Sequence, residues 1–124
     1  MDYRLRTNFD YILFMSLSAT QQQFALSLAK LVIYADSIGL PVTFGDAYRD
    51  PRLHGAMGVK LGYGSANSCH KLRLAVDLNI IKNGALAPES EYIKLQDYWR
   101  KNLGGSPMIP GDSNHFSWAH GVYR

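Results

Sequence analysis

The chain has 124 residues, of which 47% are hydrophobic and 19% charged, which is enough for one domain and too few for two. Its 13 Lys and Arg against 10 Asp and Glu give a net charge of +3 with no basic stripe, which argues against a nucleic-acid partner. The single cysteine excludes an intrachain disulfide. We therefore expect one domain over residues 1–124 that folds without disulfides and acts as a monomer.

An apolar run over residues 11–17 follows Arg4 and Arg6 and superficially resembles a signal peptide. Asp10 directly precedes the run, which only just reaches the roughly seven residues of a signal-peptide core, and no small-residue cleavage site follows it. The run is also far shorter than the ~20 residues needed to span a bilayer. We interpret it as folded structure, and we expect a protein that is made in the cytoplasm and has no transmembrane segment.

The clearest predicted element is a helix over residues 19–38. Ser18 and Gln21 have the spacing of a capping box, and apolar side chains then recur at helical intervals. Gly39 stands where a helix commonly ends, and Pro41 follows it. The pattern predicts an amphipathic helix of about five turns.

Shorter elements follow this helix. Alternating apolar residues predict strands, an Asn-Gly pair predicts a hairpin turn, and a pair of glycines closes a second helical segment. In chain order we expect a strand at 41–44, a short helix and a glycine-rich loop within 52–68, a strand at 74–80, a turn at 82–85 with a brief partner strand ending at 88, a helix at about 90–103 and a final strand at 115–118. Helices and antiparallel strands in this order indicate an α+β fold, with a small antiparallel sheet flanked by helices.

Two histidines and an aspartate are the candidate metal ligands: His70, Asp77 and His115. A catalytic zinc site has three protein ligands and an open position for water, and two imidazoles with a carboxylate suit that role. Asp77 lies in an apolar segment, where a carboxylate is costly to bury without a partner. Asp112, three residues before His115, is a further carboxylate that can accept a proton.

The spacing of the candidate ligands restricts the path of the chain. On one uninterrupted strand, His70 and Asp77 would lie ~23 Å apart and on opposite faces of the sheet. A shared metal therefore requires either a turn within residues 71–74 or a place for His70 on a neighbouring strand. On the final strand His115 faces one side and Phe116 the other, so we expect the imidazole to point into a cleft with aromatic packing behind it.

Three segments carry a resemblance to a known family. The segment SCHKLRLAVD (residues 68–77) resembles the S-x-H-x-x-G-x-A-x-D signature of the zinc D-alanyl-D-alanine carboxypeptidases, the related vancomycin-resistance dipeptidases and the phage L-alanyl-D-glutamate endopeptidases. The segment DSNHF (residues 112–116) resembles their second signature, an acidic residue three positions before a histidine that an aromatic residue follows. Tyr48-Arg49 is similar to the family's Tyr-Arg segment. The resemblance spans roughly residues 18–120, in the family's order.

The resemblance implies an open cleft that holds a single zinc ion, and it implies a role for each of several side chains. The zinc ligands would be His70, Asp77 and His115. Asp112 would act as the general base, and Arg49 would place a cation on the substrate carbonyl. The hydroxyl of Ser68 would support the site or the substrate.

The implied activity is hydrolysis of the stem peptide of bacterial peptidoglycan, by a phage or prophage endolysin of the L-alanyl-D-glutamate endopeptidase type. Such a protein would be made in the cytoplasm of the host bacterium and would reach the cell wall after release. Three alternatives stay open: a D-alanyl-D-alanine carboxypeptidase, a virion-borne enzyme that penetrates the wall, and a non-catalytic zinc module, since hedgehog signalling domains resemble this fold. A base and a cation beside the metal argue against the last, because a structural site needs neither.

Two positions depart from the family pattern. Arg73 stands where the pattern has glycine, so the turn after His70 must either avoid a positive φ or strain a non-glycine residue. Ser117 stands where a glutamate usually follows the final histidine and aromatic residue.

Three further side chains could be mistaken for parts of the site. We expect Cys69 to be a buried, inert thiol that points away from the face of His70, because neighbouring residues of a strand face opposite sides. We expect His54 to be a surface or loop residue. His120 is the rival candidate for a metal ligand.

Overall fold

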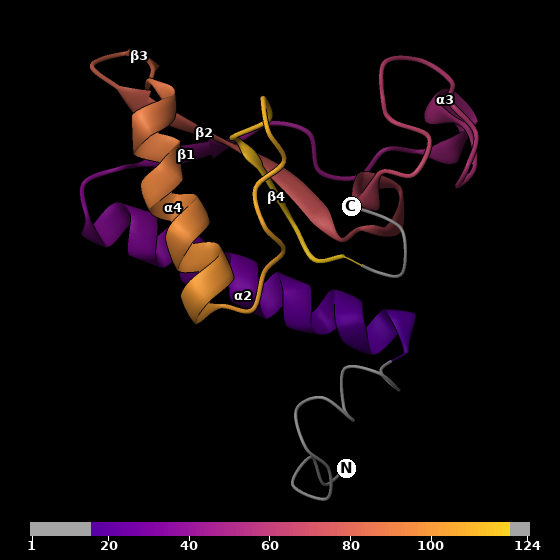
Figure 1. Cartoon of the computed structure of the whole chain (residues 1–124), viewed down its shortest axis with the longest axis horizontal. Coiled ribbons are helices and arrows are strands. Elements are labelled where there is room, and N and C mark those ends of the chain that lie inside the picture. Colours follow the sequence, from indigo (N-terminus) through magenta and orange to yellow (C-terminus); the bar gives the residue numbers. More distant parts are fainter. Residues whose placement is uncertain (1–15, 120–124) are drawn as a thin grey trace, which may run out of the picture.

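The computed structural model describes residues 16–119, which form a small α+β protein (Figure 1). In chain order its elements are α2 (Leu17–Ser37), β1 (Val42–Phe44), α3 (Pro51–His54), the 3₁₀ helix η2 (Cys69–Leu72), β2 (Ala75–Lys82), β3 (Ala85–Leu86), α4 (Glu89–Asn102) and β4 (His115–Ser117). The expected fold class is confirmed, because the strands form one small antiparallel sheet accompanied by helices. Of the apolar run over residues 11–17, residues 11–15 lie outside the described part of the chain.

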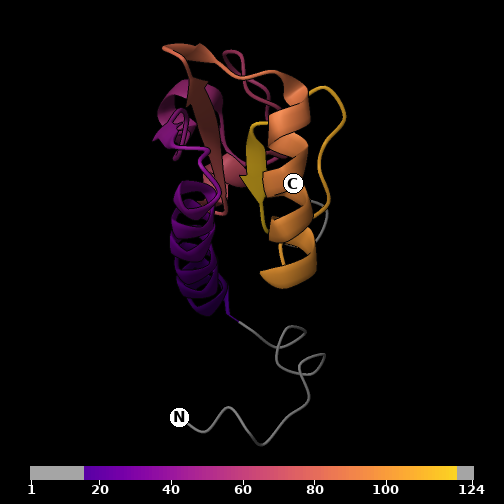
Figure 2. The ribbon, with the colours of Figure 1, turned by 90° about the vertical axis from the view of Figure 1, so that its left-hand side faces the viewer.

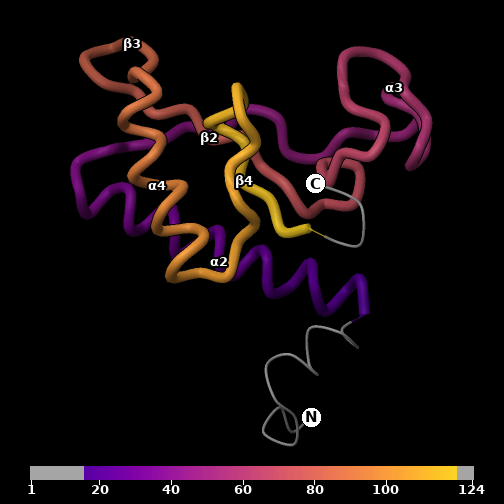
Figure 3. Tube along the Cα trace, viewed as in Figure 1, coloured from indigo at the N-terminus to yellow at the C-terminus, as the bar shows by residue number. Residues whose placement is uncertain are grey.

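β2 is the strand to which all the others pair, always antiparallel. β1 pairs with its middle, with Thr43 opposite Asn79, and β4 pairs with its beginning. β3 returns beside its end through a tight turn at Asn83 and Gly84, whose φ angles are 53° and 78°. The Asn-Gly pair predicts such a turn, because both of its central residues take a positive φ. Figure 3 shows the path of the chain through these strands.

The two faces of β2 have different surroundings. Val76, Leu78 and Ile80 are buried, whereas Asp77 and Asn79 between them are partly exposed. α2 and α4 lie beside each other next to the sheet (Figure 2). Since the apolar residues of β2 join the core that these helices cover, Asp77 lies on the face that points away from it.

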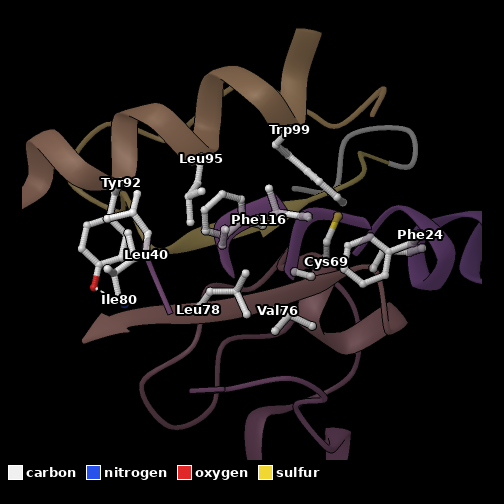
Figure 4. Packing of buried hydrophobic residues seen from close by; sticks show 14 residues of the cluster. Phe24, Leu40, Cys69, Val76, Leu78, Ile80, Tyr92, Leu95, Trp99 and Phe116 are labelled. Carbon is white, nitrogen blue, oxygen red and sulfur yellow. Dashed lines mark hydrogen bonds between the residues drawn. The ribbon is translucent and has the colours of Figure 1, made fainter. Parts of the chain in front are cut away.

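Trp99 of α4 connects the helices to the last strand. Its ring meets Phe24 of α2 and Phe116 of β4 edge to face, with centroids 5.7 Å and 6.2 Å apart. Its indole N–H also donates to the carbonyl of Ser117 at 2.9 Å. Figure 4 shows these rings in the core, together with the buried side chains of β2. This packing behind Phe116 holds β4, and with it His115, against the helical layer, as the alternation of the final strand predicted.

The N-terminal cap of α2 differs from the prediction. Ser16, not Ser18, is the N-cap, and its hydroxyl accepts a hydrogen bond from the N–H of Ala19 at 3.1 Å. Gln21 does not close a capping box with Ser18, because its side-chain amide donates to the carbonyl of Leu72 at 2.7 Å. A tertiary contact thus takes the glutamine that the local pattern assigned to the cap.

Candidate metal centre

Two of the predicted ligands face each other across two strands. Asp77 of β2 lies opposite His115 of β4. The backbone N–H and C=O of Asp77 bond to the other side, to Asp46 and Gly45, at 2.8 Å each. Asp77 and His115 are therefore a non-hydrogen-bonded pair, the kind in which side chains come closest. Asp77 Oδ1 lies 3.5 Å from His115 Nδ1.

His70 reaches this pair from η2. The hydroxyl of Ser68 caps this short helix by accepting from the N–H of His70 at 3.2 Å, and the helix ends at Arg73 in the left-handed region, with φ 56°. The compact turn brings His70 Nε2 to 3.2 Å from Asp77 Oδ1 and 3.1 Å from His115 Nδ1. Of the two chain paths that the spacing allowed, the structure has the turn.

The second ring nitrogen of His70 has a fixed partner. His70 Nδ1 lies 2.7 Å from the carbonyl oxygen of Ala47. Since a carbonyl can only accept, Nδ1 carries the hydrogen, and Nε2 of the neutral ring presents its lone pair. That lone pair faces a carboxylate oxygen and another ring nitrogen. Atoms with lone pairs this close need either a hydrogen between them, which Nδ1 of His115 can carry, or a metal ion.

The spacing of the three atoms fits a metal ion. The distances are 3.1 Å between the two ring nitrogens and 3.2 and 3.5 Å from these to the carboxylate oxygen. Two ligands bound at zinc-like lengths in tetrahedral geometry lie roughly 3.3–3.6 Å apart. His70, Asp77 and His115, the ligand cluster, could therefore hold a metal ion with little rearrangement, and no other such group occurs within residues 16–119.

Burial and the contacts with two histidines have opposite effects on the pKa of Asp77. Burial raises the pKa of its carboxyl, but the contacts with His115 and His70 outweigh this effect and hold the pKa well below its usual range. Asp77 is thus ionised at neutral pH, as a metal ligand must be. His115 is buried, and its Nε2 has no hydrogen-bond partner among the described residues. Its Nδ1 is the nitrogen that points into the ligand cluster.

A cleft of about 350 Å³ opens beside the ligand cluster, and Arg49, Ser68 and Asp112 line it together with His115. Asp112 Oδ2 lies 3.9 Å from His115 Nδ1, and its side chain is about half exposed. Arg49 Nη1 donates to the hydroxyl of Ser68 at 3.2 Å. The structure therefore brings all the predicted site residues together, with three in the ligand cluster and three around the cleft.

Two residues that the sequence did not single out hold Arg49. Asp46 Oδ2 lies 3.4 Å from Arg49 Nε and accepts a hydrogen bond from the hydroxyl of Tyr63 at 2.5 Å. That hydrogen bond raises the pKa of Tyr63. The Arg49 guanidinium also lies 5.3 Å from the centre of the Tyr63 ring. The signal for Asp46 was its place three residues before Arg49, whereas no pattern indicated Tyr63.

In the turn after His70, Arg73 adopts a positive φ, the strained one of the two alternatives that the sequence left open. Its φ of 56° is the conformation for which glycine is suited, and its guanidinium lies 3.9 Å from the centre of the Tyr48 ring. A cation–π contact of this kind contributes about 0.5–1 kcal/mol at an exposed site, which is comparable to the cost of a non-glycine residue in this region. The contact also joins the end of η2 to the segment that carries Arg49.

Of the three side chains that could be mistaken for parts of the site, two lie within the described residues, and their outcomes differ. Cys69 is buried, as expected, but it lies on η2 and not on a strand, and its thiol is 3.6 Å from the carbonyl of Trp118. The prediction of a surface or loop position for His54 was wrong. His54 ends α3 and is buried, because the following loop returns over it and Tyr63 packs edge to face on its ring at 4.9 Å. His120 lies outside the described residues.

Within residues 16–119, no helix combines the length and the apolar character needed to cross a membrane. No protein-family model matches the chain, and neither a curated protein nor a solved structure matches it.

Proposed function

We propose that the chain is a zinc-dependent peptidase that hydrolyses the stem peptide of bacterial peptidoglycan, as a phage or prophage endolysin. The observation that carries this proposal is that three convergent ligand atoms lie beside a cleft, which one of the ligands, His115, lines together with a carboxylate and a guanidinium. A purely structural metal site needs neither group, whereas amide hydrolysis needs a proton acceptor and a cation for the developing oxyanion. The resemblance of residues 68–77 and 112–116 to wall peptidases supplies the substrate class.

His70, Asp77 and His115 would hold the zinc ion. Two imidazoles and a carboxylate suit zinc and leave a fourth position open. Bound there, zinc would polarise the substrate carbonyl and make a water molecule more acidic. The hydrogen bond from His70 Nδ1 to the Ala47 carbonyl would keep that ring in the ligating orientation, as outer partners of metal-binding histidines commonly do.

Asp112 would be the general base. Its carboxylate stands in the cleft next to the ligand cluster but outside it. A carboxylate there can take the proton of the attacking water and return it to the leaving amine. Its exposure also leaves room for a substrate to approach.

Arg49 would stabilise the negative charge that develops on the carbonyl oxygen of the substrate. Its guanidinium is held at Nε by Asp46 and at Nη1 by Ser68, so little motion has to be lost when the substrate binds. Ser68 would thus serve both Arg49 and the helix that carries His70.

The test is digestion of purified peptidoglycan by the zinc-loaded protein, with mass spectrometry of the released peptides. The metal-stripped protein, and the same protein after zinc is restored, are the controls. We expect zinc-dependent cleavage between L-alanine and D-glutamate. Release of the terminal D-alanine would instead identify a carboxypeptidase of the same chemistry. Stoichiometric zinc without any peptide cleavage would contradict the proposal and favour a non-catalytic zinc module.

A further inference from the structure

The helix that carries His70 also carries a buried cation with no part in the ligand cluster. Lys71 follows His70 directly and is only 5% exposed. Within residues 16–119, no carboxylate lies within ion-pair distance of its ammonium. A buried charge without an ionic partner is costly, so other groups must satisfy it.

Backbone carbonyls satisfy the Lys71 ammonium. Its Nζ donates to the carbonyl of Val59 at 2.7 Å and to those of Ala56 and Ala66 at 3.2 Å each. An ammonium has three N–H donors, so each carbonyl receives one and none is left over. All three carbonyls belong to residues 55–67, which we name the cleft wall.

The cleft wall contains no helix or strand and has few backbone hydrogen bonds of its own. Among them, the N–H of Gly58 bonds to the carbonyl of Ala66, and the N–H of Val59 bonds to that of Ala56, both at 2.9 Å. The cleft wall follows α3, away from α4 (Figure 3). Its last residues, 65–67, line the cleft together with Arg49 and Asp112.

We infer that Lys71 is a positioning residue that ties the cleft wall to the helix of His70 and so fixes the side of the cleft that receives the substrate. Ala66 lies between two cleft-lining residues and is bonded to Lys71 through its carbonyl. Because Lys71 and His70 are neighbours, the tie sets the distance between the wall and the ligand cluster. The effect on substrate rests on the proposed function, whereas the tie itself does not.

The test compares Lys71→Met with Lys60→Met. Lys60 belongs to the same wall and loses the same charge, but it is exposed, and its Nζ donates two long hydrogen bonds of 3.4 Å to carbonyls of the wall itself, so it does not join the wall to another element. We expect amide hydrogen exchange in residues 55–67 to be at least ~10-fold faster in Lys71→Met, with α2 and α4 unchanged, because hydrogen bonds to a charged group hold this segment closed. Lys60→Met should exchange like the wild type.

Two further readouts separate the tie from a general structural role. Zinc affinity of Lys71→Met should stay within about 3-fold of wild type, and with stem peptide KM should rise about 10-fold while kcat changes by less than about 3-fold. Lys71→Arg, which keeps the charge and several donors, should restore much of the slow exchange.

Unchanged exchange of the cleft wall in Lys71→Met would overturn the inference, and so would loss of zinc binding with faster exchange throughout the sheet. If Lys71→Met does not fold, Lys71→Gln, which keeps two N–H donors without the charge, is measured against the same criteria. If the zinc-loaded wild type cleaves no stem peptide, the proposed function fails, and the exchange comparison still decides whether Lys71 ties the wall.

Discussion

The ligand cluster and the cleft wall are positioned in two different ways. Asp77 and His115 lie opposite each other on paired strands, and the adjoining backbone is hydrogen-bonded on both sides of β2. Residues 55–67 have no strand to pair with, and one buried ammonium collects three of their carbonyls. Metal ligation tolerates errors in distance of only a few tenths of an ångström, so the ligand cluster is the region that needs the support of paired strands.

The two regions differ in how far their geometry can be read from the sequence. Where strand pairing sets the position, a short motif suffices, because the sheet supplies the geometry and the side chains supply only donor atoms. Where no pairing exists, a side chain from another element can satisfy part of the backbone, as Lys71 does for three carbonyls of the cleft wall. Arg49 stands between the two regions, since its own N–H bonds to the carbonyl of His70 while its guanidinium contacts Tyr63 of the wall.

The largest expected effect lies in the ligand cluster. His115→Ala removes a metal bond, so zinc affinity should fall by at least ~10³-fold, more than the 10- to 100-fold typical of losing an outer partner. The melting temperature should then lose its dependence on zinc. His54→Ala, which removes a buried histidine outside the cluster, is the matched control for titration calorimetry and thermal unfolding. Equal zinc affinity in the two variants would remove His115 from the site.

A second variant tests the residue between the two regions. Arg49→Ala should lower kcat by ~10²–10³-fold with zinc content unchanged, because in the proposed function the guanidinium stabilises charge that develops in the transition state. Arg49→Lys should recover only part of the loss, since a point charge does not reproduce the two-sided hold at Nε and Nη1. Steady-state kinetics with stem peptide measure both, and near-normal turnover in Arg49→Ala would reduce Arg49 to a structural role.

The smallest expected effect lies at the end of η2. Arg73→Ala keeps a non-glycine residue at φ 56° and loses the contact with Tyr48, so it should destabilise the protein by about 0.5–1 kcal/mol. Arg73→Gly loses the same contact but relieves about 1 kcal/mol of backbone strain, so its stability should stay near wild type. Urea unfolding of both compares them. An alanine variant as stable as the glycine variant would show that the turn is not strained.

Local patterns predicted the fold class and most elements. The alternation of β2 and the Asn-Gly turn reflect interactions between neighbours in sequence, and they were correctly interpreted. The cap of α2 was placed two residues late, because the capping glutamine is used in a tertiary contact with Leu72. His54 was placed at the surface because nothing near it in sequence shows that the loop folds back over it.

The candidate ligands were predictable because two imidazoles and a carboxylate are typical metal-binding groups and because residues 68–77 and 112–116 resemble known signatures, and the structure brings the three donor atoms within 3.5 Å of one another. The groups that hold these side chains and the cleft wall in place were not predictable. The partner of His70 Nδ1 is a backbone carbonyl, which any residue at position 47 could offer. In the sequence Lys71 resembles an ordinary surface lysine, and only the structure shows the backbone carbonyls that its ammonium binds. Supports of this kind depend on the path of the backbone.

We propose that His70, Asp77 and His115 hold the zinc ion, whereas Asp112 takes up the proton. Turnover per bound zinc ion in Asp112→Asn tests this separation of roles most directly. The amide keeps the shape of the side chain but cannot take up the proton. We predict that zinc stays bound at about one ion per chain, while stem-peptide hydrolysis per zinc ion falls at least ~10²-fold, the usual scale of a general base. Loss of zinc would make Asp112 a ligand, and unchanged turnover per zinc ion would place the proton acceptor elsewhere; either result would contradict the account.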